Sequence, residues 1–216
     1  MKRKFATTCV HVGSEPDSST GAVVPPISLA TTFAQKGLGS LNGVDESNSF
    51  GKGFEYSRTG NPTRGAFERA IAAVEYGKFG LAFSSGLAAT NTILQSLRSG
   101  DHIVCIDDVY GGTQRLFRRV LAPHANLSFT FLDMSDPQTV ADALTSKTKL
   151  IWVESPTNPT LKISDIKALA AVARAIDRQD LWLVVDNTFM SPYLQNPLLL
   201  GADIVLHSVT KYIGGH

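Results

Sequence analysis

From residue 61 onward the sequence alternates short apolar runs with stretches of helical periodicity. In the first helical stretch Phe67, Ala70, Ile71 and Val74 recur every three or four residues, so they share one face. The predicted strands cover residues 79–83, 102–106, 128–132, 149–153, 181–185 and 203–206. The predicted helices begin near residues 61, 86, 113, 136 and 164. This alternation predicts a three-layer α/β/α fold with a mostly parallel sheet and helices on both faces.

In such sheets ligands bind beyond the carboxyl ends of the strands. Several polar or small residues of this chain fall at or just after a predicted strand end, namely Gly86, Tyr110, Glu154, Asp186 and Ser208. The topology therefore predicts that these residues gather at one edge of the sheet and form a ligand site.

The hydroxyl-rich run that ends in Lys211 follows the last predicted strand. A lysine in that position can form a Schiff base with an aldehyde cofactor, while the hydroxyls of Ser208 and Thr210 hold a phosphate beside it. A lysine after a strand is usually a solvated surface residue, so this motif needs support from elsewhere in the chain.

That support comes from the ends of two other predicted structural elements. Asp186 ends an apolar strand, where it could be an ordinary turn aspartate or could pair with a protonated pyridine nitrogen. Gly86 and Leu87 open a helix, whose N-terminal N–H groups and dipole favour an anion such as a phosphate. Tyr110 follows a strand and could stack on a ring. Together with Lys211, these residues predict a site for pyridoxal 5′-phosphate (PLP).

The first 55 residues differ in character from the rest. Pro25 and Pro26 oppose a helix around them, so residues 1–33 are expected to form an extended arm. Residues 34–55 are rich in Gly, Ser and Asn, which is typical of a mobile loop. We therefore expect an arm and loop over 1–55 and a PLP-binding domain over 56–216. Tyr56 and Arg58 follow the loop, and the planar guanidinium of Arg58 suits a phosphate.

Composition excludes several other classes of protein. The chain carries 20 basic and 19 acidic residues without a long run of one sign, so nucleic acid and anionic membranes are not expected as partners. No apolar stretch approaches the roughly 20 residues of a membrane span. The two cysteines lie far apart and the histidines are scattered, so we expect neither a metal site nor a disulfide, and a cytoplasmic location. Nucleotide-binding glycine motifs are also missing.

The ordered motifs along the chain resemble the Cys/Met-metabolism family of fold-type-I PLP enzymes, which includes cystathionine γ-lyases and γ-synthases. The resemblance rests on residues 22–28, 56–64, 108–113, 154–159, 185–189 and 208–212. Residues 83–89 and 189–193 look most like the γ-lyase branch. Members of this family continue past the position of His216 with further strands and a smaller C-terminal domain, which the resemblance implies is absent from these 216 residues.

The resemblance also implies a role for each matching position. Lys211 would bind the cofactor aldehyde and move protons, Asp186 would bind the ring nitrogen with Thr188 nearby, and Tyr110 would stack. The phosphate would be held by Gly86, Leu87, Ser208 and Thr210, with Tyr56 and Arg58 reaching in from a neighbouring subunit of a dimer of dimers. The substrate side would include Asn158, Tyr110, Glu154 and Arg115.

The implied reaction is α,γ-elimination of L-cystathionine to cysteine, 2-oxobutanoate and ammonia. The alternatives within the family are γ-synthase, cystathionine β-lyase, methionine γ-lyase and sulfhydrylase activities on small sulfur amino acids. A further alternative, of another class, is a non-catalytic chain that pairs with a full-length subunit.

Overall fold

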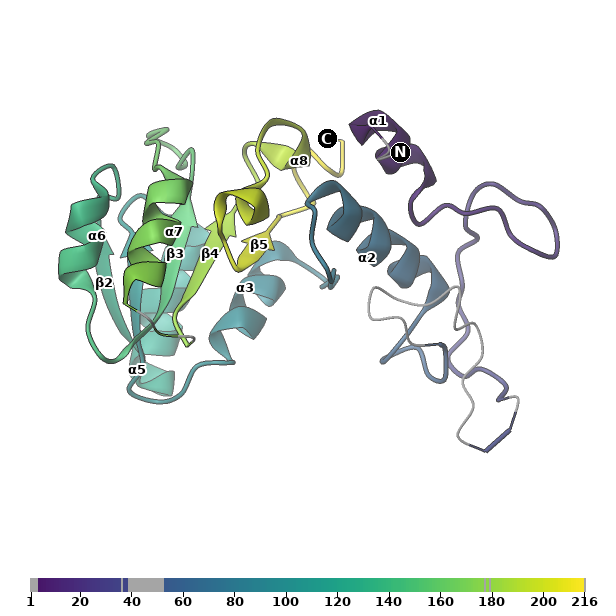
Figure 1. The fold of residues 1–216 in the computed structure, drawn as a ribbon. Helices are drawn as coiled ribbons and strands as arrows, with labels where there is room; N and C mark the ends of the chain where they lie inside the picture. Colours follow the sequence, from purple (N-terminus) through teal and green to yellow (C-terminus); the bar gives the residue numbers. More distant parts are fainter. Residues whose placement is uncertain (1–3, 36, 39–52, 177, 179, 216) are drawn as a thin grey trace. The chain divides into compact units, whose positions relative to one another are not determined.

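The computed structural model describes residues 4–35, 37–38, 53–176, 178 and 180–215. These residues form two compact units, Met1–Ala82 and Phe83–His216 (Figure 1). The second unit contains the sheet. Among the described residues, no helix combines the length and the apolar character needed to cross a membrane.

The sheet of the second unit has five parallel strands in the order β2-β1-β3-β4-β5. They are β1 (His102–Ile106), β2 (Ser128–Leu132), β3 (Thr148–Glu154), β4 (Trp182–Asp186) and β5 (Ile204–Leu206). The predicted parallel α/β fold is therefore confirmed, and all five strands lie within two residues of the predicted ranges.

Helices connect the strands and cover both faces of the sheet. The chain supplies α3 (Gly86–Leu94), α4 (Gly111–Leu116), the π-helix η1 (Phe117–Leu121), α5 (Ala122–Ala125), α6 (Pro137–Ala143), α7 (Ile166–Ala175), α8 (Ser191–Leu194) and the 3₁₀ helix η2 (Pro197–Leu200). Helices α6 and α7 lie side by side on one face, and α5 lies on the other (Figure 1).

Burial on both faces explains why the strands are almost uninterrupted apolar runs. Every residue of β1 is buried, and so are the apolar residues at the centre of β3 and β4. Trp152 of β3 is fully buried and meets Phe117 edge to face, with ring centroids 5.4 Å apart. This rigid core holds the carboxyl ends of the strands at one edge of the unit.

The predicted strand at residues 79–83 is not formed, although the structure describes all of these residues. The backbone N–H of Ala82 instead donates to the side-chain carboxylate of Glu68 at 3.0 Å. Because Phe79 and Leu81 are exposed, the apolar run lacks the burial of the other strands. The composition of this segment matched a strand, but the N–H of Ala82 donates to a side chain of α2 (Pro62–Val74).

The first unit contains α1 (Phe5–His11) and α2 (Pro62–Val74), which contact each other. Helix α2 starts as expected, with Pro62 in its first turn and the Asn61 side chain accepting the N–H of Arg64 at 3.0 Å. The expectation of an extended arm was wrong at residues 5–11, because Pro25 and Pro26 oppose a helix only in their own vicinity. Most of the expected loop at 34–55 lies outside the described residues.

Candidate active site

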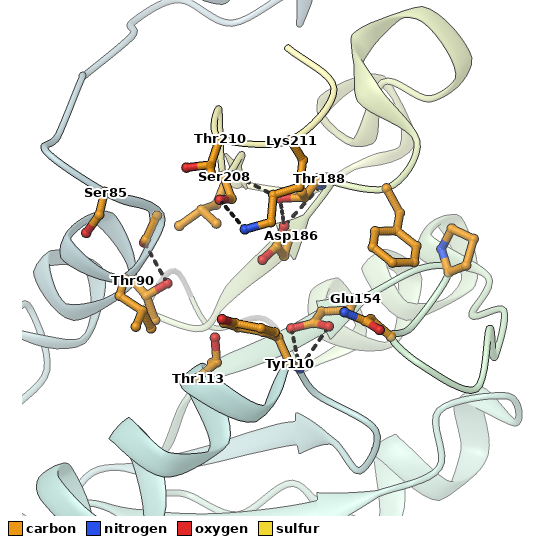
Figure 2. A pocket seen from close by; sticks show the side chains of 16 residues that line it. Ser85, Thr90, Tyr110, Thr113, Glu154, Asp186, Thr188, Ser208, Thr210 and Lys211 are labelled. Atoms are coloured by element: carbon orange, nitrogen blue, oxygen red, sulfur yellow. Dashed lines mark hydrogen bonds between the residues drawn. The ribbon is translucent and has the colours of Figure 1, made fainter. Parts of the chain in front are cut away.

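The carboxyl ends of the strands in the second unit surround a cavity of about 220 Å³ (Figure 2). The side chains and backbone that line it come from the ends of β3, β4 and β5, from the start of α3 and from the segment after β1. They are Ser85, Gly86, Leu87, Thr90, Tyr110, Thr113, Glu154, Pro156, Asn158, Asp186, Thr188, Phe189, Leu206, Ser208, Thr210 and Lys211.

Asp186 is the last residue of β4 and is tied to the turn that follows it. Its Oδ1 accepts the backbone N–H of Thr188 at 3.0 Å and the Thr188 hydroxyl at 2.5 Å. The same Thr188 hydroxyl oxygen accepts the N–H of Ser208 at 2.8 Å. Burial raises the pKa of Asp186, and the two hydrogen bonds from Thr188 oppose that rise. A cationic partner in the cavity would therefore favour the ionised form of this carboxylate.

Lys211 extends into the cavity from the segment after β5 (Figure 2). Its Nζ donates to the Ser208 hydroxyl at 3.1 Å and lies 5.8 Å from the centre of the Tyr110 ring. The amine, the Asp186 carboxylate and the aromatic ring are thus directed into one space.

Glu154 ends β3 and holds the segment that carries Tyr110. Both of its carboxylate oxygens accept the backbone N–H of Tyr110, each at 3.0 Å. Glu154 is buried and is the register partner of Asp186 on the adjacent strand. Burial, reinforced by the nearby Asp186 charge, raises the pKa of Glu154 to about 8. Near neutral pH Glu154 is therefore mostly protonated, and Glu154 and Asp186 together carry less than two negative charges.

The start of α3 could receive an anion beside Ser208 and Thr210, which line the same cavity. The Ser85 side chain caps the helix by accepting the N–H of Ala88 at 3.0 Å. The N–H groups of Gly86 and Leu87 precede the first intrahelical hydrogen bonds and are available to a ligand. At Gly86 a Cβ atom would lie only 3.1 Å from the Cβ of Ser208, a contact so tight that Ser208 would have to shift by a few tenths of an ångström.

The residues of the cavity fit PLP. A helix start with adjacent hydroxyls suits its phosphate, a buried carboxylate suits its ring nitrogen, and an amine suits its aldehyde. The observation that tests this fit is Asp186, a partly buried carboxylate that lines the cavity and whose pKa is raised by burial, so the protein groups around it only partly compensate its charge. A protonated pyridine nitrogen would supply that compensation.

The structure brings ten of the thirteen predicted site residues together in the cavity: Gly86, Leu87, Tyr110, Glu154, Asn158, Asp186, Thr188, Ser208, Thr210 and Lys211. Arg115 is exposed on α4 and is not among the lining residues. Tyr56 and Arg58 belong to the first unit, where the Arg58 guanidinium lies 5.1 Å from the centre of the Tyr56 ring. The functional roles of all thirteen stay predictions.

Sequence reasoning did not assign Thr90, Thr113 or Phe189 to the site, although all three line the cavity. Thr90 lies one helical turn after Gly86 and its hydroxyl donates to the Gly86 carbonyl at 3.1 Å. The spacing of four residues in a predicted helix could have identified it. Phe189 directly follows Thr188, so its proximity was also available from the sequence.

Comparison with known proteins assigns the chain to a family. Residues 6–216 match the family model described as Cys/Met metabolism PLP-dependent enzyme. The chain is 52% identical over 216 residues to a probable cystathionine gamma-synthase of Herpetosiphon aurantiacus, covering 100% of this chain and 63% of the relative. It is 54% identical over 213 residues to the cystathionine gamma-lyase of Dictyostelium discoideum, covering 99% of this chain and 52% of the relative.

Its fold is similar to the crystal structure of cystathionine gamma-lyase from Lactobacillus plantarum complexed with L-serine, with a TM-score of 0.89 and 48% identity. That match covers 99% of this chain and 52% of the solved one. The chain thus spans about half to two thirds of the length of these relatives. The family match, the shared fold and the geometry of the cavity agree: the chain belongs to the Cys/Met metabolism family of PLP-dependent enzymes.

Proposed function

We propose that the protein is a carbon–sulfur lyase that splits L-cystathionine, with one water, into cysteine, 2-oxobutanoate and ammonia by α,γ-elimination. The observation that carries this proposal is the convergence of Lys211, Asp186 and Tyr110 on one cavity. We further propose that the whole protein acts as a cytoplasmic homotetramer in which Tyr56 and Arg58 serve the phosphate site of a neighbouring subunit.

When bound, PLP supplies an electron-accepting ring that stabilises negative charge at the α-carbon of the substrate. The chain itself supplies the proton chemistry and the orientation. Lys211 is the base that takes the α-proton and returns protons during the elimination. Asp186 favours the protonated ring nitrogen, and Tyr110 fixes the plane in which the reacting bonds lie. Asn158 binds the substrate carboxylate.

The relatives do not separate lyase from synthase, because a protein named synthase and one named lyase are 52% and 54% identical to this chain. The lyase activity is preferred because residues 83–89 and 189–193 resemble the γ-lyase branch. The second candidate functions are cystathionine γ-synthase, cystathionine β-lyase and methionine γ-lyase. A chain that pairs with a full-length subunit without turnover of its own is the candidate of another class.

Product analysis with L-cystathionine distinguishes the γ-lyase from the β-lyase and from the pairing chain. The purified protein is incubated with PLP and L-cystathionine, and cysteine, 2-oxobutanoate, homocysteine and pyruvate are quantified. The γ-lyase proposal expects cysteine and 2-oxobutanoate in equal amounts, and no turnover in Lys211→Ala. Homocysteine and pyruvate would instead indicate β-lyase activity. Turnover that requires an added full-length subunit would favour the pairing chain.

A further inference from the structure

Asp108 lies outside the cavity but connects two of the segments that line it. Its Oδ2 accepts the Thr157 hydroxyl at 2.6 Å and the backbone N–H of Thr160 at 2.9 Å, and the Thr160 hydroxyl donates to the same oxygen. Asp108 precedes Tyr110 by two residues in the segment after β1. One carboxylate oxygen thus collects three donors from the turn after β3.

The turn held in this way carries Asn158, which lines the cavity. Thr157 is fully buried, its N–H donates to the Lys162 carbonyl at 3.0 Å, and its hydroxyl oxygen accepts the Lys162 N–H at 2.9 Å. Asp108 therefore accepts hydrogen bonds from the turn before Asn158, at Thr157, and after it, at Thr160. The hydroxyl donors of Thr157 and Thr160 lower the pKa of Asp108, so the acceptor of these hydrogen bonds is the ionised carboxylate.

Lys162 forms a second connection between the turn after β3 and the segment after β1. The Nζ of Lys162 donates to Asp107 and to Asp133, each at 2.8 Å to Oδ2. These ion pairs are partly exposed, so they are expected to contribute little energy individually. Lys162 lies four residues after Asn158, whereas Asp108 hydrogen-bonds to Thr157 and Thr160, which lie closer to Asn158 in the turn.

We infer that Asp108 is a positioning residue that fixes Asn158 in the cavity wall and so sets the affinity of the site for an amino-acid carboxylate. The positioning follows from the hydrogen bonds alone, whereas the effect on a carboxylate rests on the proposed function. Asp108 would act through the turn, without touching the cofactor or the substrate.

The first test measures positioning in the cofactor-free protein, so that it does not depend on activity. Asp108→Ala should accelerate hydrogen–deuterium exchange at the Thr160 amide by about tenfold or more, because its acceptor is lost. Exchange in β4 and β5 should stay unchanged. Asp142→Ala removes the same charge from an exposed position on α6 and serves as the matched control. Unchanged exchange at Thr160 would overturn the inference.

The second test uses PLP-loaded protein and glycine as a carboxylate probe, with binding followed by the absorbance of the cofactor. Asp108→Ala should weaken glycine about tenfold while the Kd for PLP changes less than about threefold. Asp108→Asn should restore part of the glycine affinity, because its amide oxygen can accept two of the three donors but lacks the negative charge. An equal loss of PLP and glycine binding in Asp108→Ala would indicate a merely structural role and contradict the inference.

Thr160→Val keeps the inference testable if Asp108→Ala does not fold, since it deletes one donor at an exposed residue. This variant should weaken glycine binding in the same direction by a smaller factor, and unchanged binding would count against the inference. Failure of the wild-type protein to bind PLP would overturn the proposed function and the predicted carboxylate effect, whereas the exchange result would still decide the positioning role.

Discussion

Both carboxylate oxygens of Glu154 lie 3.0 Å from the backbone nitrogen of Tyr110, so a buried acid at the end of β3 holds the aromatic wall of the cavity. Glu154 is also the register partner of Asp186. Two carboxylates on adjacent strand ends therefore share one site: Glu154 holds the backbone of Tyr110, and Asp186 faces the space for a cationic partner.

The raised pKa of Glu154 predicts a pH dependence of stability. Its pKa is about 8 in the folded protein against an ordinary value of 4.5, so between these pH values the folded state binds more protons at this group than the unfolded state. Its contribution to the free energy of unfolding should therefore fall as the pH rises from about 4.5 to 8. Glu154→Gln should gain about 3–4 kcal/mol relative to the wild type between pH 5 and pH 8 in the cofactor-free protein.

Urea denaturation of both proteins at the two pH values measures this difference. The same pH dependence in the wild type and in Glu154→Gln would show that Glu154 does not titrate in this range.

Thr188 is predicted to tune the carboxylate of Asp186. Thr188→Val deletes the hydroxyl that donates to Asp186 and accepts from the N–H of Ser208. PLP affinity should fall about tenfold, because the ionised form of Asp186 loses a donor and the partly buried N–H of Ser208 loses its acceptor. Titration of the protein with PLP, followed by absorbance, gives the Kd. Thr188→Ser, which keeps the hydroxyl, should bind nearly as the wild type does, and equal losses in both variants would refute this role.

The close approach at Gly86 predicts that any side chain there disturbs the phosphate site. In Gly86→Ala the new Cβ would lie 3.1 Å from the Cβ and 3.3 Å from the Oγ of Ser208. Ser208 or the start of α3 must then move, and PLP affinity should fall about tenfold or more. Gly111→Ala is the matched control, because a Cβ there meets no atom within 4 Å. PLP binding that is equally strong in both variants would argue against a phosphate at this helix start.

Most of the cavity lining could be predicted from the sequence, because the carboxyl ends of parallel strands lie at the same edge of the sheet. Residues 102–106 and 128–132 are mostly apolar runs, and their bounds agree with the buried strand β1 and the partly buried edge strand β2. Asp186 and Lys211 follow such runs, so the parallel topology alone brings them to one edge. Residues 79–83 are also largely apolar, but the N–H of Ala82 donates to the carboxylate of Glu68 and the segment pairs with no described strand.

The role of Asp108 could not be derived from the sequence. It depends on a turn in which Thr157 and Thr160 point at one carboxylate, and no periodicity or propensity encodes that geometry. The bonds from Glu154 to Tyr110 likewise join residues 44 positions apart. The sequence shows which groups reach the edge of the sheet, whereas the contacts that orient them require the folded chain.

The most direct test of the account is mass spectrometry of the protein after incubation with PLP and reduction with borohydride, followed by peptide mapping. The account predicts a pyridoxyl group on Lys211, and none in the corresponding peptide of Lys211→Ala. A pyridoxyl group found only on other lysines, or no modification when the cavity is intact, would contradict the assignment of Lys211 as the cofactor-binding residue.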